Sequence, residues 1–358
     1  MKSWHHLRRG FFARIKHFWP GIWILLLGTA LSSCTATPPL FDAQGPAAAH
    51  ITNLWWLLFW MATAVFLVVL GFLLMAFVRR PPHERRNHTR QHDTARVYAE
   101  EATVTRRGTR IVVLGGIVIP LIILFVVFGA TIWTLRALTT PAIEEELTIH
   151  VVGQRWWWEV QYPMQQFATA NEIHIPAGEP VRLVLSSANV IHSFWVPALQ
   201  GKMDLVPGKV NSLWLQADEP GVYRGECAEF CGVQHAKMNF LVIAQPRAEY
   251  ERWLEQQQQP AAQPTAELAQ LGQQVFFEAG CMECHTIKGT DATGKLGPDL
   301  THVASRRTLG SAVLTNNLGN LGGWISNPQH SKPGSLMPPS TVTGVELQAL
   351  LAYLSTLQ

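Results

Sequence analysis

Two long stretches in the first third of the chain contain no charged residue. Residues 51–78 and 111–135 hold no Asp, Glu, Lys or Arg, and each exceeds the roughly 20 residues that a helix needs to cross the hydrocarbon core of a bilayer. A buried helix of a soluble domain is the alternative, but few such helices stay uncharged over this length. The pattern therefore predicts a hairpin of two transmembrane helices over residues 51–136.

A shorter apolar stretch precedes this hairpin. It runs uncharged from His17 to Ser33 behind a basic opening, and it ends in Leu31-Ser32-Ser33-Cys34. A short apolar core between a basic start and small residues is typical of an export signal. The last four residues resemble a bacterial lipobox, which predicts a signal peptide over residues 1–33, lipidation of Cys34, and an exported segment over 34–50. An uncleaved anchor or an incidental buried cysteine is the alternative.

Apolar runs become short after the hairpin and are broken by Pro and Gly. Examples are Leu147–Val152, Val181–Leu185 and Phe240–Ile243. Short apolar runs at such spacing are typical of strands in two packed sheets. We therefore expect an antiparallel β-sandwich over residues 137–250.

A polar segment rich in Gln and Pro follows the predicted sandwich. Residues 251–265 lack a sustained apolar period, which predicts a flexible linker. Helical spacing of apolar residues returns over Ala266–Phe277 and again over Val345–Leu357. The last part of the chain, residues 266–358, is therefore predicted to be an all-α domain.

The charge is unevenly divided along the chain. The 28 Lys and Arg against 25 Asp and Glu give a net charge of +3, but 15 basic and 5 acidic residues lie at or before Arg136, and 13 and 20 follow it. Residues 79–110 alone carry nine arginines and four acids. Because Lys and Arg are retained on the cytoplasmic side, this loop is predicted to be cytoplasmic and everything after Arg136 to lie outside. The division argues against a uniform soluble globule.

Four potential metal ligands lie within twelve residues of the predicted sandwich: Cys227, Cys231, His235 and Met238. Thiolate, imidazole and thioether together are the soft ligand set that selects copper, whereas structural zinc is bound by Cys and His without Met. A disulfide between the two cysteines is the alternative. A blue-copper site needs only one Cys, so the second cysteine indicates a different copper centre.

A second motif lies in the all-α domain. Cys281, Cys284 and His285 form Cys-x-x-Cys-His, the attachment motif of c-type haem, in which both cysteines form thioethers and the histidine binds iron. A thioredoxin-like redox pair is the competing use of Cys-x-x-Cys, but no βαβ pattern surrounds it. The motif predicts one covalent haem.

A sixth iron ligand is expected from the residues after His285. Met337, followed by two prolines that stiffen its loop, is the favoured candidate, and His302 and His330 are the alternatives. Loops with Met-Pro-Pro resemble those of small class I cytochromes c. The segment at Gly297-Pro298 resembles that family's proximal segment, which implies that the Pro298 carbonyl accepts a hydrogen bond from the haem-binding histidine. With Cys34 as the lipidated residue, no cysteine of the five is left for a disulfide.

The segment 227–238, with Val190–Pro197 and Lys202–Gly208, resembles the dinuclear copper centre, CuA, of cytochrome c oxidase subunit II. The resemblance implies a cupredoxin-like domain. It also implies six ligands: the bridging thiolates of Cys227 and Cys231, the imidazoles of His192 and His235, the weakly bound Met238, and the backbone carbonyl of Glu229. Two bridging thiolates let one electron be shared between two metals, so that little rearrangement accompanies transfer.

Further roles follow from the same resemblance. Trp156, in a run of three tryptophans, corresponds to the residue through which an electron can enter, although packing is the alternative. The Glu229 side chain resembles a ligand for magnesium at the border with subunit I, with Asp204 as an outer contact or as a turn carboxylate. Asn189 stands where the family often has Asp, which removes a negative charge from the surface where cytochrome c would dock.

The whole order resembles subunit II of a caa-type cytochrome c oxidase, in which a cytochrome c domain is fused to the C-terminus. The fold class expected is a multidomain membrane protein: a transmembrane hairpin, a cupredoxin-like β-sandwich over residues 137–250 and an all-α class I cytochrome c domain over 266–358. The location implied is the bacterial cytoplasmic membrane, crossed more than once, with both redox domains on the outer face.

The function implied is that of subunit II of a proton-translocating oxidoreductase complex. Electrons from cytochrome c or a cytochrome bc complex would reach haem c, then CuA, then subunit I, where oxygen is reduced to water and protons are pumped. Subunit III is a further implied partner, and no nucleic acid is expected. The alternatives are the corresponding subunit of a copper-containing nitric oxide reductase and a freestanding membrane-anchored electron carrier.

Overall fold

The computed structural model describes residues 40–79, 106, 108–139, 147–342 and 344–358. The predicted signal peptide and Cys34 lie outside these residues, as do residues 80–105 and 107 of the predicted cytoplasmic loop.

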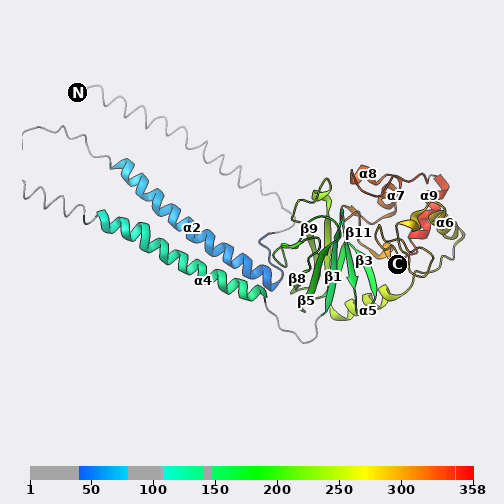
Figure 1. The fold of residues 1–358 in the computed structure, drawn as a ribbon, viewed down its shortest axis with the longest axis horizontal. Helices are drawn as coiled ribbons and strands as arrows, with labels where there is room; N and C mark the ends of the chain where they lie inside the picture. The colour runs from blue at the N-terminus through cyan, green and yellow to red at the C-terminus, as the bar shows by residue number, and fades with distance from the viewer. Residues whose placement is uncertain (1–39, 80–105, 107, 140–146, 343) are drawn as a thin grey trace, which may run out of the picture. The chain divides into compact units, whose positions relative to one another are not determined.

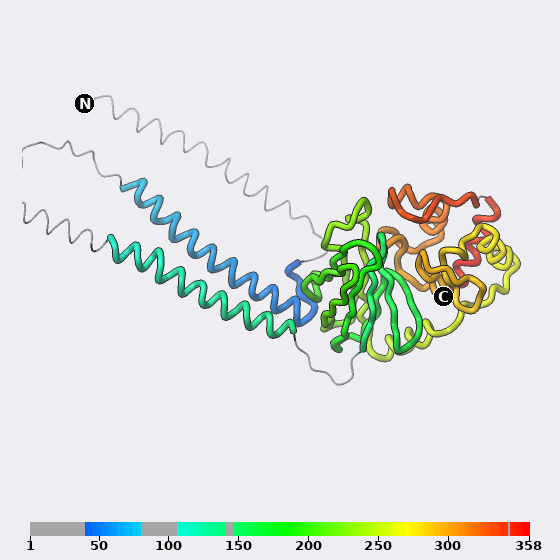
Figure 2. Tube along the Cα trace, in the orientation of Figure 1, coloured from blue at the N-terminus to red at the C-terminus, as the bar shows by residue number. Residues whose placement is uncertain are grey.

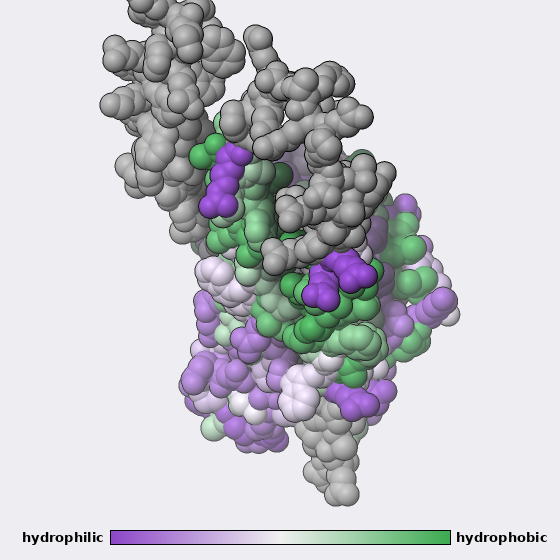
Figure 3. Space-filling view, turned by 90° about the vertical axis from the view of Figure 1, so that its left-hand side faces the viewer, coloured by the Kyte–Doolittle hydropathy of each residue, from purple (hydrophilic) through white to green (hydrophobic). Residues whose placement is uncertain are grey.

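Both uncharged stretches form long helices (Figure 1). Helix α2 spans Pro46–Val78, and helix α4 spans Ile119–Thr139 directly after the π-helical turn η1, Leu114–Val118. By length and composition, Pro46–Val78 and Gly108–Thr139 could each cross a membrane, and neither span is buried inside the protein. A surface view coloured by hydropathy shows apolar side chains gathered in contiguous patches on one face (Figure 3). Exposed apolar surface of this extent needs a cover, which lipid or another subunit would supply.

The start of α2 is fixed to the β-rich domain and carries a cluster of aromatic rings. The Gln44 amide donates to the Ala198 carbonyl at 2.7 Å, and the Ala48 amide donates to the Leu199 carbonyl at 3.2 Å. The rings of Trp55, Trp56, Phe59 and Trp60 lie one against the next from the third turn onward, with neighbouring centroids 4.8 to 6.1 Å apart. Tryptophan is enriched where a spanning helix leaves the bilayer. This end of α2 therefore fits the membrane surface on the side of the β-rich domain.

Residues 148–245 form two packed five-stranded sheets (Figure 1). One sheet has the order β3 (Phe167–Ala170), β2 (Trp157–Tyr162), β1 (Thr148–Gln154), β5 (Val181–Ser187) and β8 (Asn211–Leu215). The other has the order β4 (Glu172–Pro176), β10 (Asn239–Gln245), β9 (Gly221–Cys227), β6 (His192–Trp195) and β7 (Met203–Leu205). Alternate residues point inward, as in β1, where Ile149 and Val151 are fully buried.

The three apolar runs chosen from the sequence are strands β1, β5 and β10, but the sandwich is not wholly antiparallel. Strand β1 pairs with β5 in parallel, and β10 pairs with β4 in parallel. An alternating pattern reports which side chains point inward and says nothing of strand direction, so this part of the expectation was wrong.

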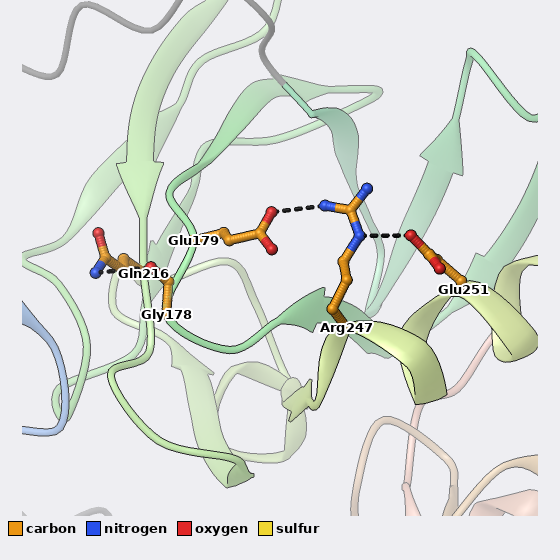
Figure 4. Close-up of polar contacts among 5 residues, drawn as sticks. All are labelled: Gly178, Glu179, Gln216, Arg247 and Glu251. Atoms are coloured by element: carbon orange, nitrogen blue, oxygen red, sulfur yellow. Dashed lines mark hydrogen bonds and ion pairs between the residues drawn. The ribbon is translucent and has the colours of Figure 1, made fainter.

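The predicted linker begins with a helix. Helix α5, Arg247–Gln258, places Trp253 and Leu254 against the sandwich, and the Trp253 ring stacks on His174 with centroids 3.9 Å apart. At its start Arg247 pairs with Glu179 at 2.6 Å and with Glu251 at 2.7 Å (Figure 4). These ion pairs are exposed and stabilise little, so the helix is held by its aromatic face and by the helix propensity of its Glu and Gln residues.

The last domain is helical, as predicted, and its chain can be followed in Figure 2. Its elements are α6 (Glu267–Glu278), η3 (Cys281–Glu283), η4 (Val303–Ser305), the short pair β11 (Thr308–Leu309) and β12 (Leu314–Thr315), α7 (Leu318–Ser326), α8 (Pro328–Ser331) and α9 (Gly344–Leu354). Helices α6 and α9 cross closely at Gly272, where an added Cβ would lie 1.8 Å from the Ala349 carbonyl oxygen. Their crossing forms the core with Phe276, Leu350 and Tyr353.

Candidate metal centres

The candidate copper ligands converge at one end of the second sheet. Strand β6 begins with His192, the neighbouring strand β9 ends with Cys227, and the loop that follows supplies the rest before β10 begins. His192, Cys227 and Cys231 form the group of three converging metal-ligand residues within the part of the chain that the structure describes. Residues separated by 35 positions in the sequence are therefore brought together by strand pairing.

Six donor atoms lie close together at this end. The Cys227 and Cys231 sulfurs are 3.8 Å apart. Each has its own imidazole, with His192 Nδ1 3.9 Å from Cys227 Sγ and His235 Nδ1 3.7 Å from Cys231 Sγ. The Met238 sulfur lies 3.8 Å from Cys231 Sγ, and the Glu229 carbonyl oxygen lies 3.2 Å from Cys227 Sγ. All six predicted ligand positions are thus brought together.

The centre of the site is buried, and its two thiols interact. His192 and Met238 are fully buried, and both cysteines are buried. The hydrogen bond between the two thiols holds the pKa of Cys227 well below its usual range, with His192 adding to the effect. The same interaction, together with burial, raises the pKa of Cys231. Thiolate is the form in which cysteine binds metal, so the lowered pKa of Cys227 favours metal binding.

Two residues that the sequence analysis did not place in the site orient His192. The Asn189 side-chain oxygen lies 3.3 Å from Nε2, the ring nitrogen opposite the one that faces Cys227. Gly153, at the end of β1, lets the ring pack closely, since an added Cβ would lie 2.7 Å from His192 Cδ2. A hydrogen bond to the second ring nitrogen is the usual means of fixing a metal-binding histidine.

Both Trp156 and Trp158 contact the loop between β9 and β10, residues 228–238, which we call the copper loop. The half-buried Trp156 donates its indole N–H to the Cys231 carbonyl at 2.7 Å. Trp158 is fully buried, donates to the Met238 carbonyl at 3.4 Å, and has its ring centroid 6.0 Å from that of His192. The two indoles thus differ in burial, and Trp156 is the one that is not wholly enclosed by the core.

The donor set fits a pair of copper ions. The two sulfurs lie 3.8 Å apart, and each has one imidazole beside it. A thioether and a backbone carbonyl are the further donors. Soft sulfur with imidazole selects copper. Both cysteines are free thiols in the structure, so the competing disulfide is not formed.

The predicted magnesium residues lie at the edge of this region. Glu229 and Asp204 are both exposed, and Asp204 stands opposite Ser193, the residue after His192, on the neighbouring strand β7. The carbonyl of Asp204 accepts from the Asn211 side chain at 2.6 Å. Neither carboxylate belongs to the converging group of metal ligands.

The Cys-x-x-Cys-His motif forms a tight turn between α6 and a loop. Cys281 and Cys284 are free and half-buried, and the His285 amide donates back to the Cys281 carbonyl at 3.0 Å. His285 Nδ1 lies 2.7 Å from the Pro298 carbonyl oxygen, the contact that the resemblance implies. Gly297 is needed here, because an added Cβ would lie 2.5 Å from the His285 ring. Burial lowers the pKa of His285, which favours the neutral ring that binds iron.

The three candidates for the sixth iron ligand differ in their surroundings. Both ring nitrogens of the buried His302 face backbone carbonyls, with Nδ1 2.7 Å from Gln358 O and Nε2 3.1 Å from Gln259 O. His330 is exposed at the end of α8. Met337 is half-buried in a loop held by Gln329, whose side chain donates to the Met337 carbonyl at 3.0 Å. The structure thus occupies His302 elsewhere and identifies Gln329, which the sequence analysis missed, as the residue that braces the methionine loop.

The residues around the motif fit a covalent haem. Two free half-buried thiols are available for thioethers, a neutral imidazole is fixed by a carbonyl, and Gly297 leaves room beside that ring. Met337 is available as a further iron ligand, because its hydrogen bond with Gln329 uses the backbone carbonyl and leaves the thioether unused.

Apolar helices, a cupredoxin-like domain with a two-thiolate site and a c-type cytochrome domain together define a membrane-anchored electron-transfer protein. Residues 163–245 match the family model described as cytochrome C oxidase subunit II, periplasmic domain, and residues 269–358 match that described as cytochrome c. A cytochrome c oxidase subunit 2 of Alkalihalophilus pseudofirmus is 36% identical over 325 residues, which cover 88% of this chain and 90% of the relative. The chain belongs to the cytochrome c oxidase subunit 2 family, in the form with a fused cytochrome c domain.

A second relative agrees with this, and a solved structure is also similar in sequence. A cytochrome c oxidase subunit 2 of a Bacillus species is 31% identical over 261 residues, covering 67% of this chain and 72% of the relative. The solved periplasmic domain of subunit II of cytochrome oxidase of Bradyrhizobium japonicum is 29% identical, covers 33% of this chain and 96% of its own, and has a TM-score of 0.32.

The expected fold class is confirmed by these matches: two apolar helices, a cupredoxin-like domain and a cytochrome c domain follow in order. The chain is therefore an oxidase subunit through which electrons enter, with CuA copper and haem c as its cofactors. It is membrane-anchored with an outward-facing domain, and it assembles with a catalytic subunit I.

Proposed function

We propose that this chain accepts electrons at haem c, passes them to the CuA copper pair and delivers them to subunit I, which reduces oxygen to water and pumps protons. The observation that carries the proposal is the convergence of six donor atoms, two of them thiolates 3.8 Å apart, in the same chain as a complete haem attachment motif. When bound, the two cofactors supply reversible one-electron chemistry, and the protein supplies their positions and potentials.

The proposed ligand roles follow from the described distances. Cys227 and Cys231 would hold the two coppers, each cysteine supported by its own histidine, and the Met238 thioether and the Glu229 carbonyl would complete the set. Rigid placement supports fast transfer, because ligands that need not move add little reorganisation to each electron step. Burial of His192 and Met238 excludes water from the sulfurs.

At the haem, Cys281 and Cys284 form the thioethers and His285 binds iron, held by the Pro298 carbonyl. Met337 is the proposed sixth ligand, supported by the engagement of both His302 nitrogens with backbone carbonyls. A thioether opposite an imidazole raises the potential of haem iron, which suits a carrier placed between a respiratory donor and copper.

Trp156 is the proposed point at which an electron reaches the copper site. Its indole is half-buried and bonded to the carbonyl of Cys231, so it joins the outer surface of the copper loop to a bridging ligand. The exposed Glu229 carboxylate is the proposed ligand of a magnesium ion at the border with subunit I.

The remaining proposals concern assembly. Both α2 and α4 cross the bacterial cytoplasmic membrane, residues 79–110 face the cytoplasm, and Cys34 is lipidated after removal of residues 1–33. Subunit III and a donor, cytochrome c or a cytochrome bc complex, are the further partners. A basic donor is favoured, because the 20 acidic residues after Arg136 outnumber the 13 basic ones.

Purification of the complex from its membrane tests the proposal. The expected preparation contains a haem-copper subunit I, consumes oxygen with reduced cytochrome c, and shows the mixed-valence electron paramagnetic resonance signal of two coppers sharing one electron. In Cys231→Ser this copper signal should vanish while the haem c spectrum stays. Recovery of the chain alone, fully active as a carrier, would overturn the oxidase assignment, and an unchanged copper signal in the variant would overturn the ligand assignment.

A further inference from the structure

Two segments of the cytochrome domain lie against the copper domain. Residues 307–312 contact strand β4 and the turn before β2, and residues 331–334 contact the copper loop. Both segments are joined to the copper domain by hydrogen bonds from named side chains, and two of those side chains are charged and buried.

Glu172, at the start of β4, is the first of these buried charges. It is 3% exposed. Its carboxylate accepts from the amides of Arg307 at 2.8 Å and Thr308 at 2.9 Å, and from the Thr308 hydroxyl at 3.0 Å. A buried carboxylate without hydrogen-bond donors is costly. The donors that Glu172 requires come from the cytochrome domain. Burial raises the pKa of Glu172, whereas these hydrogen bonds and the positive charge of Arg306 act against that rise.

Lys332, in the cytochrome domain, is the second. It is also 3% exposed, and its ammonium donates to the Trp156 carbonyl at 2.8 Å and to the Ser311 hydroxyl at 3.1 Å. The Ser311 hydroxyl donates to the same Trp156 carbonyl at 2.8 Å. Trp156 is therefore bonded through its carbonyl to the cytochrome domain and through its indole to Cys231.

The copper loop itself contacts the segment that precedes Met337. Lys237 donates its ammonium to the Ser331 carbonyl at 2.5 Å, and the Gln234 amide group donates to the Pro333 carbonyl. Val233 packs so closely on Gly334 that an added Cβ there would lie 2.8 Å from its methyl carbon. The residues on both sides of His235 are thus in contact with the loop that carries the proposed haem ligand.

The connection between the domains is short and bound to the cytochrome domain. Helix α5 ends at Gln258, whose carbonyl accepts from the Lys288 ammonium at 2.6 Å. The Ala261 amide donates to the Lys288 carbonyl at 2.8 Å, and the Gln259 carbonyl faces His302. Few residues between the two domains are therefore without contacts to either domain, although a flexible linker was expected here.

We propose that the cytochrome domain is docked permanently on the copper domain by two buried ionisable side chains supplied reciprocally, Glu172 from one domain and Lys332 from the other. Electrons then cross a pre-formed interface between the Met337 loop and the copper loop, without a search by a tethered domain. The use of the interface for electron transfer rests on the proposed function, whereas the docking itself does not.

Amide hydrogen exchange in the complete complex tests the dock at Glu172. We expect protected amides at Arg307 and Thr308 in the wild type. Exchange in Glu172→Ala should be faster by about tenfold or more, the equivalent of one lost hydrogen bond to a charged group. The matched control is Glu219→Ala, which removes an exposed carboxylate from the same domain and should leave both amides unchanged. Unprotected amides in the wild type, or equal protection in Glu172→Ala, would overturn the proposal.

The kinetics of transfer test the same dock without relying on that variant. After photoreduction of haem c, the rate of copper reduction should not change when glycerol raises the viscosity, because no domain movement precedes transfer. Lys332→Met should slow transfer about tenfold or more and make it viscosity-dependent, while Lys295→Met, which removes an exposed ammonium from the same domain, should match the wild type.

The outcomes separate the dock from the electron path. A wild-type rate that falls as viscosity rises would overturn docking even if transfer is efficient. Protected amides at Arg307 and Thr308 without any reduction of copper by haem would leave the dock standing and refute the proposed electron path. Spectra of haem c and of the copper pair in each variant show that both cofactors are bound.

Discussion

The side-chain oxygen of Asn189 lies 3.3 Å from Nε2 of His192, while Nδ1 of the same ring faces Cys227. Asn189 stands where the family often has an acidic residue, and the sequence predicted that the missing charge would affect the docking surface for cytochrome c. Its position in the structure indicates a different role. It fixes the ring plane and the tautomer of a proposed copper ligand.

Removal of this contact should weaken copper binding. We expect Asn189→Ala to lower copper affinity by roughly tenfold to a hundredfold, the range for loss of a partner behind a metal-binding histidine. Asn189→Asp, which keeps an oxygen at the same place, should retain copper. Competition with a copper chelator, followed by the electron paramagnetic resonance signal, measures both. Equal affinities in Asn189→Ala and the wild type would show that the His192 ring is held by other contacts.

Gly153 should tolerate no side chain. In Gly153→Ala the new Cβ would lie 2.7 Å from the His192 ring, so the ring or β1 must shift, at a cost of about 1–3 kcal/mol for overpacking. The temperature of thermal unfolding and the copper content should both fall. Gly323→Ala in α7, where an added Cβ meets nothing within 4 Å, is the control and should have near wild-type stability.

Met337 gives a test of the haem ligand. In Met337→Ala the covalent haem should remain, because Cys281 and Cys284 are intact, but the sixth ligand should change and the haem potential should fall. Potentiometric titration with optical detection follows this directly. His330→Ala should leave the potential unchanged, since that ring is exposed. An unaltered potential in Met337→Ala would direct attention to His302 or His330.

His174 should make the copper domain less stable in acid. Burial lowers the pKa of His174 from 6.5 to about 4, with the Gln245 hydrogen bond acting in the opposite direction and Arg307 adding to the fall. The unfolded chain therefore binds a proton below pH 6.5 that the folded chain accepts only near pH 4. The stability that the neutral ring contributes is complete above pH 6.5 and is lost as the pH falls towards 4, by about 3 kcal/mol in all.

The comparison of wild type with His174→Gln separates the contribution of His174 from that of the other titrating groups. Unfolding free energies of the two proteins should diverge between pH 4 and 6.5, with the wild type losing more stability on acidification. Parallel curves would mean that His174 is protonated in the folded protein or that water reaches it.

Local patterns made most of the architecture predictable. The two spans, the strands β1, β5 and β10, and helices α6 and α9 follow from apolar spacing, which depends only on near neighbours. Cys227, Cys231, His235 and Met238 could be predicted as one ligand set because they lie within twelve residues, as could the haem attachment motif, whereas His192 was predicted only from the resemblance.

What the sequence did not reveal depends on distant partners. Asn189, Gly153 and Gln329 matter through atoms that folding brings near, and none has a characteristic local pattern. The parallel pairing of β1 with β5 has the same cause, because alternation does not encode direction. Helix α5 was missed since its aromatic residues are too few to form a clear period in a Gln-rich stretch.

His302 joins the two ends of the cytochrome domain. One ring nitrogen faces the carbonyl of Gln259, where the domain begins, and the other faces the carbonyl of Gln358, while Leu357 is fully buried beside it. A domain whose ends meet at one point can be appended or inserted without separating distant parts of its host. The two ends of the cytochrome domain are thus held at one point by a single side chain.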